Sequence, residues 1–520
     1  MMRVAAVLAV AVALVAAVIA EETGGDDAPR PHIFMVIVDD FGWAEVGYHR
    51  SEEYKQDVQT PTIDALVQEG IELNRHYVHY ACTPNPCQPG CGMPQNMTGV
   101  AEHLQSAGYA THFVGKWDVG MTTPQHTPKG RGYDTSLNYF GHGNWMWSEA
   151  EWQGSYNHRS DLPPCEPPAC FKDFWETDKP AAELNGTQYE EAIFRDRVYS
   201  ILEQHDPSTP LFLTYASKVA HYPLQAPIEY QEKFSFIEEP HRRVYHAMVA
   251  FLDDNLANFT SLLKSKGMWN NTLMVLTSDN GGYVKSFLGD CDNNTSHGYA
   301  CFNGEAGANY PLQGGKYSTL EGGVRVNAFV SGGFVPEERR GTREDEMVHV
   351  ADWYATFAAL AGVDPTDHRA AQHNLPPIDS LNIWPLLSGA NVSSPRQTLL
   401  IDPHALIWGK WKVLHGNVIE ANWGGPQYPN ASTADDPIEN YSRNCSQGCL
   451  YNVHDDPSER TDLAASEPEQ LQTMLQMLQL QAQSIWSQPI GQIDPACSTA
   501  AMDRYNGFIG PWLDVDGQLL

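Results

Sequence analysis

Short apolar runs alternate along the first part of the chain with segments whose apolar residues recur every three or four positions. Ile33–Val38 is a continuous apolar run, typical of a strand buried on both faces of a parallel sheet. Similar runs follow at Thr111–Val114, Leu211–Tyr215 and Leu273–Leu276. Helical periodicity is found from Thr60 to Gly70, over Val100–Ala107 and over Val244–Leu263. This alternation predicts an α/β fold: a large, mostly parallel mixed sheet flanked by helices.

The pattern changes beyond about Pro395. Lys410–Leu414 and Leu450–Val453 have the character of antiparallel strands, and Pro468–Ile485 has the periodicity of a helix. We therefore predict a main domain over residues 31–395 and a smaller C-terminal α+β subdomain with an antiparallel sheet over residues 396–520.

The first 20 residues have the pattern of a signal peptide. Arg3 precedes an uncharged run from Val4 to Ala20, and Val18 and Ala20 stand three and one positions before Glu21, as at a cleavage site. The alternative is an uncleaved membrane anchor, but an Ala-rich run of this length is short for a membrane span. No later run of about 18 apolar residues follows, so we expect the mature chain to be soluble.

Potential glycosylation sites and cysteines agree with export. Asn-x-Ser/Thr sequons, glycan acceptors in the secretory pathway, begin at Asn96, Asn185, Asn258, Asn270, Asn293, Asn294, Asn391, Asn430, Asn440 and Asn444. The chain has ten cysteines, and three close pairs predict short-loop disulfides: Cys165/Cys170, Cys291/Cys301 and Cys445/Cys449. We expect an N-glycosylated protein that is secreted or resides in a lysosome-like lumen.

The charge balance limits the partners of the protein. The chain has 32 Lys and Arg against 64 Asp and Glu, which gives a net charge of −32 over 520 residues. Nucleic acid and anionic membranes both require a basic surface, so neither is an expected partner. An anionic substrate would need a locally basic pocket.

Carboxylates follow two of the predicted strands. Asp39 and Asp40 come directly after the first, and Asp279 and Asn280 follow the strand at Leu273–Leu276. Because ligands of open α/β sheets bind at the carboxyl ends of strands, these side chains predict one site. Several hard oxygens without sulfur or imidazole favour calcium or magnesium over zinc. The alternative is that both segments are Asp/Asn turns.

Eight segments in a fixed order resemble the sulfatase family, close to the arylsulfatase B type, within the alkaline-phosphatase-like superfamily. They read VIVDDFGWAEVG, TPTIDALVQEGI, GYATHFVGKWDVG, KGRGYD, HYPLQAP, LTSDNGG, LQGGKYSTLEGGVRV and LYNVHDDPSERTDL. The resemblance spans roughly His32 to Leu463. It implies an alkaline-phosphatase-like fold and the hydrolysis of sulfate esters, either aryl sulfates or sulfated carbohydrates.

The resemblance also implies a cofactor and a nucleophile. One calcium ion would be held by Asp39, Asp40, Asp279 and Asn280, with Cys82 beside it. Cys82 occupies the position of the cysteine that a formylglycine-generating enzyme oxidises, and the hydrated aldehyde would attack sulfur and form a covalent sulfate ester. The resemblance assigns Lys116, His221 and Lys316 to the sulfate oxygens and the leaving group.

The chain departs from the family pattern at two places. The pattern Cys-x-Pro-x-Arg reads CTPNP from Cys82 to Pro86, without the arginine, and roughly twenty residues, including a helix, are missing before the helix at Val100. Without conversion, Cys82 could instead form a disulfide with Cys87 or Cys91. The pattern Lys-Trp-His-x-Gly reads KWDVG, which places Asp118 where a histidine would help to expel sulfate; its carboxylate could still act as a base.

Four hypotheses on function follow. The chain is an active sulfatase; or a catalytically impaired relative that binds calcium and sulfated ligands; or a truncated gene model of an active sulfatase. A phosphatase of the same superfamily is the fourth, although we find no second cluster of His and Asp ligands for its second metal. Aromatic residues are dense from Tyr139 to Trp152, which indicates either a sugar or aryl subsite or core packing.

Overall fold

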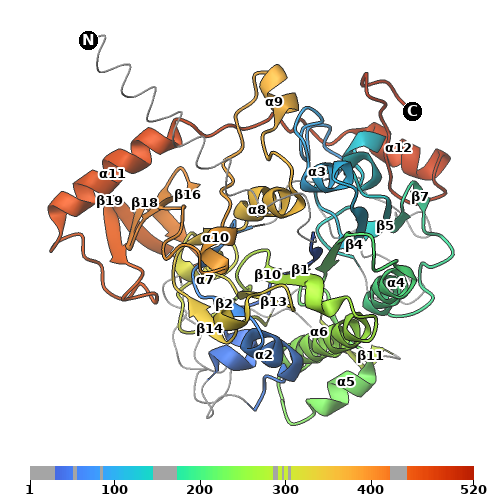
Figure 1. Ribbon diagram of the computed structural model, residues 1–520, viewed down its shortest axis with the longest axis horizontal. Coiled ribbons are helices and arrows are strands. Elements are labelled where there is room, and N and C mark those ends of the chain that lie inside the picture. Colours follow the sequence, from blue (N-terminus) through green and yellow to red (C-terminus); the bar gives the residue numbers. More distant parts are fainter. Residues whose placement is uncertain are drawn as a thin grey trace.

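A ten-stranded mixed sheet lies at the centre of the computed structural model (Figure 1). The structure describes residues 30–50, 56–81, 86–144, 172–284, 291–295, 298–301, 306–421 and 442–520. In spatial order the strands of the sheet are β14 (Thr342–Glu344), β2 (Ile71–Leu73), β13 (Ala328–Ser331), β10 (Thr272–Ser278), β1 (His32–Val38), β8 (Leu211–Ser217), β4 (Ala110–Lys116), β5 (Thr135–Tyr139), β6 (Trp175–Glu176) and β7 (Lys179–Pro180).

The five central strands β10, β1, β8, β4 and β5 are all parallel, and antiparallel pairing begins at β13 on one side and β6 on the other. Val38 pairs with both Ser278 of β10 and Ser217 of β8, so the carboxyl ends of these three strands lie level. The predicted mostly parallel sheet and its strands are confirmed.

One face of this sheet, here called the α6 face, is covered by long helices. They are α2 (Pro61–Gln68), α4 (Glu190–Gln204) and α6 (Pro240–Ser265), with α5 (Ile228–Lys233) beside α6. The sheet residues that point to this face, such as Phe34 and Val36 of β1 and Leu213 of β8, are almost wholly buried. The predicted helices at Thr60–Gly70 and Val244–Leu263 correspond to α2 and α6.

The opposite face, here called the α8 face, is covered by shorter helices. They are α3 (Val100–Ser106), α8 (Asp352–Ala361), α10 (Trp384–Leu387) and α12 (Pro495–Asp503), and α9 (His368–Gln372) follows α8. The alternate residues of the same strands point here, among them Ile33 and Met35 of β1 and Phe212 of β8. Figure 1 shows the sheet between the two layers, with α6 on one side and α3 and α8 on the other.

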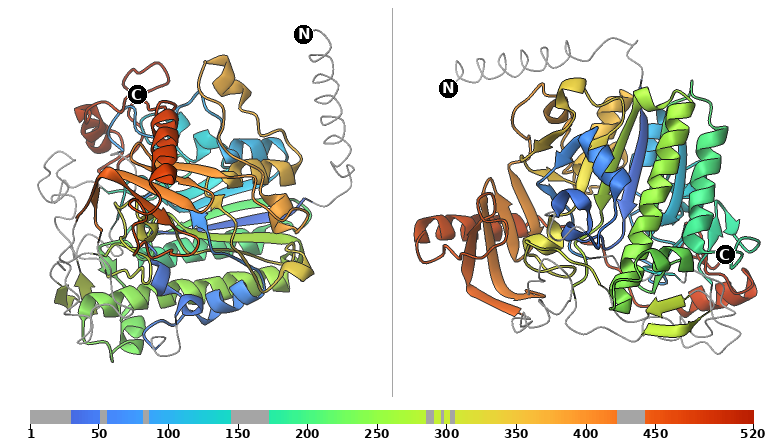
Figure 2. Two further views of the ribbon diagram at one scale, coloured as in Figure 1. Left: turned by 90° about the vertical axis from the view of Figure 1, so that its left-hand side faces the viewer. Right: turned by 90° about the horizontal axis from the view of Figure 1, so that it is seen from below.

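A second sheet lies beside the main body (Figure 2). Its strands are antiparallel and consecutive, and one helix packs on them: β16 (Thr398–Asp402), β17 (Ala405–Trp408), β18 (Trp411–Ile419), β19 (Ser442–Asn452) and α11 (Pro468–Ala482). The two predicted strands and the predicted helix of this region are confirmed. The fully buried ammonium of Lys412 joins the small sheet to the main body, because its Nζ lies 3.0 Å from carboxylates of both Glu321 and Glu459.

The last residues of the chain return to the main body. The disulfide Cys87–Cys497 links the start of α12 to the loop before α3, and Trp512 is buried in the core of the α8 face. The division of the chain at residue 395 stays a prediction; residues 495–512 pack on the main sheet rather than on the small one.

Three disulfides are present among the described cysteines. Cys291–Cys301 joins β11 (Cys291–Thr295) to β12 (Gly298–Cys301), and Cys445–Cys449 lies within β19, so both predicted pairs are confirmed. Cys165/Cys170 lies outside the described residues. Because Cys87 pairs with Cys497, one of the two possible disulfides of an unconverted Cys82, that with Cys87, is not formed. Burial raises the pKa of the buried Cys91 thiol to about 12.

Features related to export are only partly described. The predicted signal peptide lies outside the described residues. Five sequon asparagines are exposed: Asn96, Asn258, Asn270, Asn391 and Asn444. Within the described part of the chain, every helix is too short or too polar to cross a membrane.

Candidate active site

Two pairs of acidic and amide side chains meet beyond the carboxyl ends of β1 and β10. The backbone N–H groups of Asp40 and Asn280 donate to Oδ1 of Asp279, at 3.0 and 2.8 Å. Nδ2 of Asn280 donates to Oδ1 of Asp40 at 2.6 Å. These contacts bring together three of the four predicted oxygen ligands of calcium, and Asp39, the fourth, directly precedes Asp40.

The backbone is specialised at this point. Asp40 has a φ of 54°, in the left-handed region that residues other than glycine seldom adopt. A Cβ on Gly281 would overlap the carbonyl oxygen of Gly322, so the turn after β10 needs glycine to pass this loop. Together these features hold the two acidic turns close to each other.

Two lysines from different elements face the carboxylates. Nζ of Lys116, the last residue of β4, donates to Oδ2 of Asp39 at 2.9 Å. Nζ of Lys316, from the loop after Gly314, donates to Oδ2 of Asp40 at 2.9 Å. Both ammonium groups are buried, so the site carries the local positive charge that an anionic substrate would require in this acidic protein.

The third predicted cationic residue, His221, lies in the loop after β8. Its Nε2 is 3.7 Å from Oδ2 of Asp40. Burial, followed by the ammonium of Lys316, holds the pKa of His221 well below its usual range, so the imidazole is neutral. Nδ1 lies 2.7 Å from the carbonyl oxygen of Tyr222 and carries the hydrogen in a neutral ring, which leaves a lone pair on Nε2.

The carboxylates have more negative charge than the lysines neutralise. Burial raises the pKa of the Asp39 carboxyl well above its usual range and raises that of Asp279, although Lys116 opposes both shifts. In addition, Oδ1 of Asp39 is buried and accepts no hydrogen bond. An unpaired buried carboxylate oxygen is costly unless a cation faces it, so the residues present fit a metal ion.

The potential metal ligands differ in one respect from those predicted from the sequence, which were oxygen atoms alone. One ligand atom from each of Asp39, Asp40 and His221 lies within 4.8 Å of the others, so an imidazole adjoins the carboxylates. The sequence did not predict His221 as a neighbour of Asp40, because about 180 residues separate the two and no characteristic spacing links them. Carboxylate and amide oxygens still dominate the group.

Asp118, the departure from the family pattern, has a partner that sequence reasoning missed. Its Oδ2 lies 3.9 Å from Nζ of Lys116 and accepts a hydrogen bond from Nδ1 of His142 at 3.0 Å. Asp118 has a φ of 46°, which the two-residue turn after β4 imposes. The only sequence signal for His142 was its place in the aromatic segment after β5, where it was one polar residue among many.

A third buried lysine, Lys218, lies close enough to Asp39 to be influenced by its charge, and the sequence did not predict it. Burial lowers the pKa of Lys218 to about 8, although Glu190, Asp39 and Glu191 all favour its charged form. Its Nζ donates to the carbonyl oxygen of Asn144. The sequence did contain a signal for Lys218, because this lysine directly follows the buried strand β8 and stands three residues before His221.

The remaining candidates are described only in part. Cys82 lies outside the described residues, as does the aromatic segment beyond Asn144. Of that segment, Tyr139 and Phe140 are buried in the core rather than exposed to a ligand, which supports core packing for its first residues.

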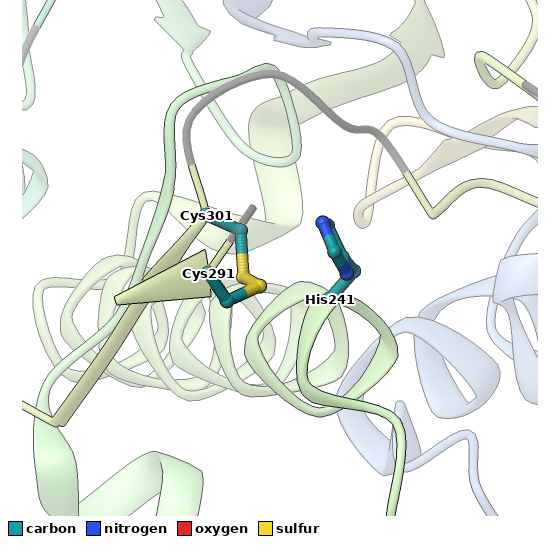
Figure 3. Close-up of side chains that lie close together, drawn as sticks. All are labelled: His241, Cys291 and Cys301. Carbon is teal, nitrogen blue, oxygen red and sulfur yellow. A yellow bond between two sulfur atoms is a disulfide. The ribbon is translucent and has the colours of Figure 1, made fainter. Parts of the chain in front are cut away.

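A second group of potential metal ligands comprises His241, Cys291 and Cys301 (Figure 3). Figure 3 shows the imidazole of His241, near the start of α6, facing the sulfur atoms, which are bonded to each other. Disulfide sulfur is not the thiolate that binds metal ions, so this group is a covalent link between strands and not a metal site in this state.

Comparison with known proteins agrees with the geometry. A family model described as Sulfatase matches residues 31–363. Arylsulfatase J of Mus musculus is 31% identical over 507 residues, covering 88% of this chain and 76% of that protein. N-acetylgalactosamine-6-sulfatase of Mus musculus is 26% identical over 403 residues, covering 71% and 68%.

A solved structure resembles the whole chain. It is that of Ps i-CgsB in complex with k-i-k-neocarrahexaose, with a TM-score of 0.66 and 25% identity, covering 92% of this chain and 99% of that one. The matched family model covers more than half of the chain, and the acidic strand ends that it includes meet in one buried site. The chain therefore belongs to the sulfatase family of sulfuric ester hydrolases.

Proposed function

We propose that this chain has the site of a calcium-dependent hydrolase of sulfate esters whose nucleophile would be formylglycine at Cys82, and that the chain as written lacks the sequence needed to form that nucleophile. The observation that carries the proposal is the buried group of Asp39, Asp40, Asp279 and Asn280, in which an oxygen of Asp39 has no hydrogen-bond partner. When bound, the ion would supply positive charge to hold and polarise a sulfate oxygen. Formylglycine would supply the attacking hydroxyl.

The cationic side chains have roles that follow from their positions. Lys116 and Lys316 each contact one of the carboxylates at 2.9 Å, and their ammonium groups can donate further hydrogens to a sulfate oxygen. His221 is neutral with a lone pair on Nε2, so it can accept a proton from a hydroxyl in the site. Charge that develops on sulfate oxygens would thus meet fixed cations in a water-poor site.

Asp118 and His142 form the second pair that can move a proton. The carboxylate of Asp118 orients the imidazole of His142 through a 3.0 Å hydrogen bond, and the His142 side chain is more exposed than that of Asp118. We assign to this pair the task that the family pattern gives to a histidine at position 118. The carboxylate of Asp118 would hold the imidazole of His142 and the ammonium of Lys116 in position. His142 would accept the proton of the hydroxyl whose ionisation expels sulfate.

Sulfated carbohydrate is the substrate class that we propose. Mouse N-acetylgalactosamine-6-sulfatase is named for a sulfated amino sugar, and Ps i-CgsB was solved with a neocarrahexaose. The exposed sequons and the predicted signal peptide support the proposal that the protein acts in the secretory pathway, either outside the cell or in a lysosome-like lumen.

A second candidate function is binding without turnover. The observation that favours it is the segment from Cys82 to Pro86, which lacks the family's arginine and the helix that follows. The metal ligands and both lysines are intact, so a sulfated ligand could bind to a chain whose nucleophile is not formed. A truncated gene model of an active sulfatase would have the same properties.

Calcium titration of the secreted chain, after treatment with a chelator, tests the metal site. We expect calcium to raise the melting temperature of the chain and to leave that of Asp39→Asn almost unchanged. Asp206→Asn is the matched control, because Asp206 is exposed and precedes the amino end of β8, at the opposite edge of the sheet from the site. Equal calcium-dependent shifts in the chain and in Asp39→Asn would count against this site.

Peptide mass spectrometry of the same secreted protein tests the nucleophile. We expect the chain as written to carry Cys82 as a thiol or a disulfide, because its modification sequence lacks the arginine. An aldehyde at Cys82 would contradict this expectation and would leave the active sulfatase as the better description.

A further inference from the structure

The α8 face of the central sheet contains a cavity of about 370 Å³. Its floor is one side of three neighbouring strands, formed by Met35 and Ile37 of β1, Phe113 of β4, and Phe212, Thr214 and Ala216 of β8. Its roof includes Val100 and Ala101 of α3 and Trp353, Tyr354 and Phe357 of α8. The lining residues are alternate residues of β1 and of β8, so the cavity lies along one face of the sheet.

The cavity extends from the surface into the packing of the α8 face. Protein interiors contain few voids larger than a water molecule. Met35 and Ala216 each keep 6% of their surface exposed although they lie on central strands, whereas Val36 and Leu213 on the opposite face of the same strands are 0% exposed. Space therefore reaches the middle of the sheet from the α8 face.

The walls offer aromatic rings and almost no available polar atoms. Thr214 Oγ1 and the Tyr133 hydroxyl share a hydrogen bond of 3.1 Å, and the Tyr354 hydroxyl donates to a backbone carbonyl. The charge of Lys116, which lines one end, is compensated by Asp39 at 2.9 Å. A water molecule inside would find few partners, and apolar cavities of this kind stay dry and take up apolar molecules.

From these features we infer that this cavity is a binding site for a neutral, planar aromatic molecule, beside the proposed sulfate site, with which it shares Lys116. Its volume is within the range of about 300 to 1,000 Å³ of small-molecule sites. The ring of such a ligand would lie between the sheet and α8 and contact Phe212 and Trp353. Two cations line the cavity, and both are already paired: Lys116 with Asp39 at 2.9 Å and Arg131 with Glu102 at 3.1 Å. An anionic group on the ligand would lose its water without gaining an unpaired cation, so a neutral ligand is favoured.

Naphthalene is the probe for the test, and naphthoate, its anionic counterpart, is the matched ligand. We expect saturable naphthalene binding to the full chain by titration calorimetry, together with a higher melting temperature. We expect naphthoate to bind at least about tenfold more weakly. No saturable binding of naphthalene, or equal binding of naphthoate, would overturn the inference.

Variants that fill the cavity locate the bound probe. Ala216→Leu on the floor and Ala351→Leu on the wall each add a branched apolar side chain to the cavity, and both should weaken naphthalene binding at least about tenfold. Ala182→Leu, at an exposed position, should leave the affinity unchanged. Ala351→Leu keeps the test valid if Ala216→Leu fails to fold. Unchanged affinity in a folded filled variant would place the probe elsewhere and refute the assignment.

Discussion

Both faces of the central sheet are mainly apolar, but they are packed differently. On the α6 face, a helix of 26 residues lies along the strands together with α2 and α4, and the sheet residues beneath are fully buried. On the α8 face, the helices over the same strands have seven and ten residues, and a cavity of about 370 Å³ remains between them. The difference shows that an apolar strand pattern secures burial of a face but not its complete filling.

The proposed active site adjoins the less completely filled face of the sheet. Lys116 lines the end of the cavity and also pairs with Asp39, so the α8 face is continuous with the acidic group. In the sequence, α3 follows the segment from Cys82, which by family resemblance should itself be followed by a further helix, and α3 lies on this same side of the sheet. The four experiments below compare the two faces and test whether the cavity on the α8 face is where the helix missing after Cys82 would lie.

The largest effect is expected from adding the missing segment. The chain as written should hydrolyse a generic aryl sulfate at or near background, because the nucleophile lacks its anchoring helix. Insertion of a family-like CTPSR segment and helix after Pro84 should raise turnover at least about a hundredfold, since misplacement of about 1 Å can cost that much. The inserted helix should also abolish naphthalene binding.

Two controls accompany the insertion. Cys82→Ala in the repaired chain should return turnover to background. Robust turnover by the chain as written, lost on Cys82→Ala, would contradict the prediction. If the repaired chain is inactive, Asp118→His in that background tests whether the Asp118–His142 pair is at fault.

A matched pair of methionine truncations measures the packing of each face. Met274 of β10 points to the α6 face and is 0% exposed, whereas Met35 of β1 lines the cavity. Met274→Ala should cost about 3–5 kcal/mol of unfolding free energy, and Met35→Ala about 1–2, because Met35 already lacks contacts on one side. Denaturant unfolding measures both, and equal costs would show that the two faces are packed alike.

The pH dependence of stability offers a marker for the α6 face. Burial raises the pKa of Asp253 of α6 to about 6, despite hydrogen bonds from the backbone of Thr62 and Ile63. A folded pKa above the unfolded value means that stability is full below about pH 3.8 and is lost as pH rises through about 6, by up to about 3 kcal/mol.

Asp253→Asn should therefore flatten the stability profile between about pH 4 and 6 while other carboxylates titrate as before. Denaturant unfolding at several pH values checks this. Asp206→Asn is the control, because Asp206 is exposed. A profile that keeps its slope in Asp253→Asn would show that another group is responsible.

The smallest effect is expected from enlarging an alanine on each face. Ala247→Leu in α6 adds volume where Ala247 is 0% exposed and should cost about 1–3 kcal/mol. Ala216→Leu extends into the cavity and should be neutral or stabilise the fold by less than about 1 kcal/mol. Melting temperatures distinguish these outcomes, and a clear loss of stability in Ala216→Leu would show that the cavity cannot accept the side chain.

By itself, the amino-acid sequence determined the layout of the sheet and the identity of its acidic strand ends. Ile33–Val38 and Leu273–Leu276 are apolar without interruption, and Leu211–Tyr215 is apolar except for Thr214. Each forms a central parallel strand, the kind of strand that is buried on both faces. Parallel neighbours end at the same edge, so Asp39 and Asp279 could be expected to meet.

The tertiary structure alone decided which other side chains reach that edge and how fully each face is filled. The imidazole of His142 meets Asp118, and that of His221 meets Asp40, through loops whose course no local pattern records. The cavity beside Met35 is the space between the sheet and the helices α3 and α8 that the side chains of these elements do not fill. Such a difference is a sum over distant segments, so no single stretch of sequence contains it.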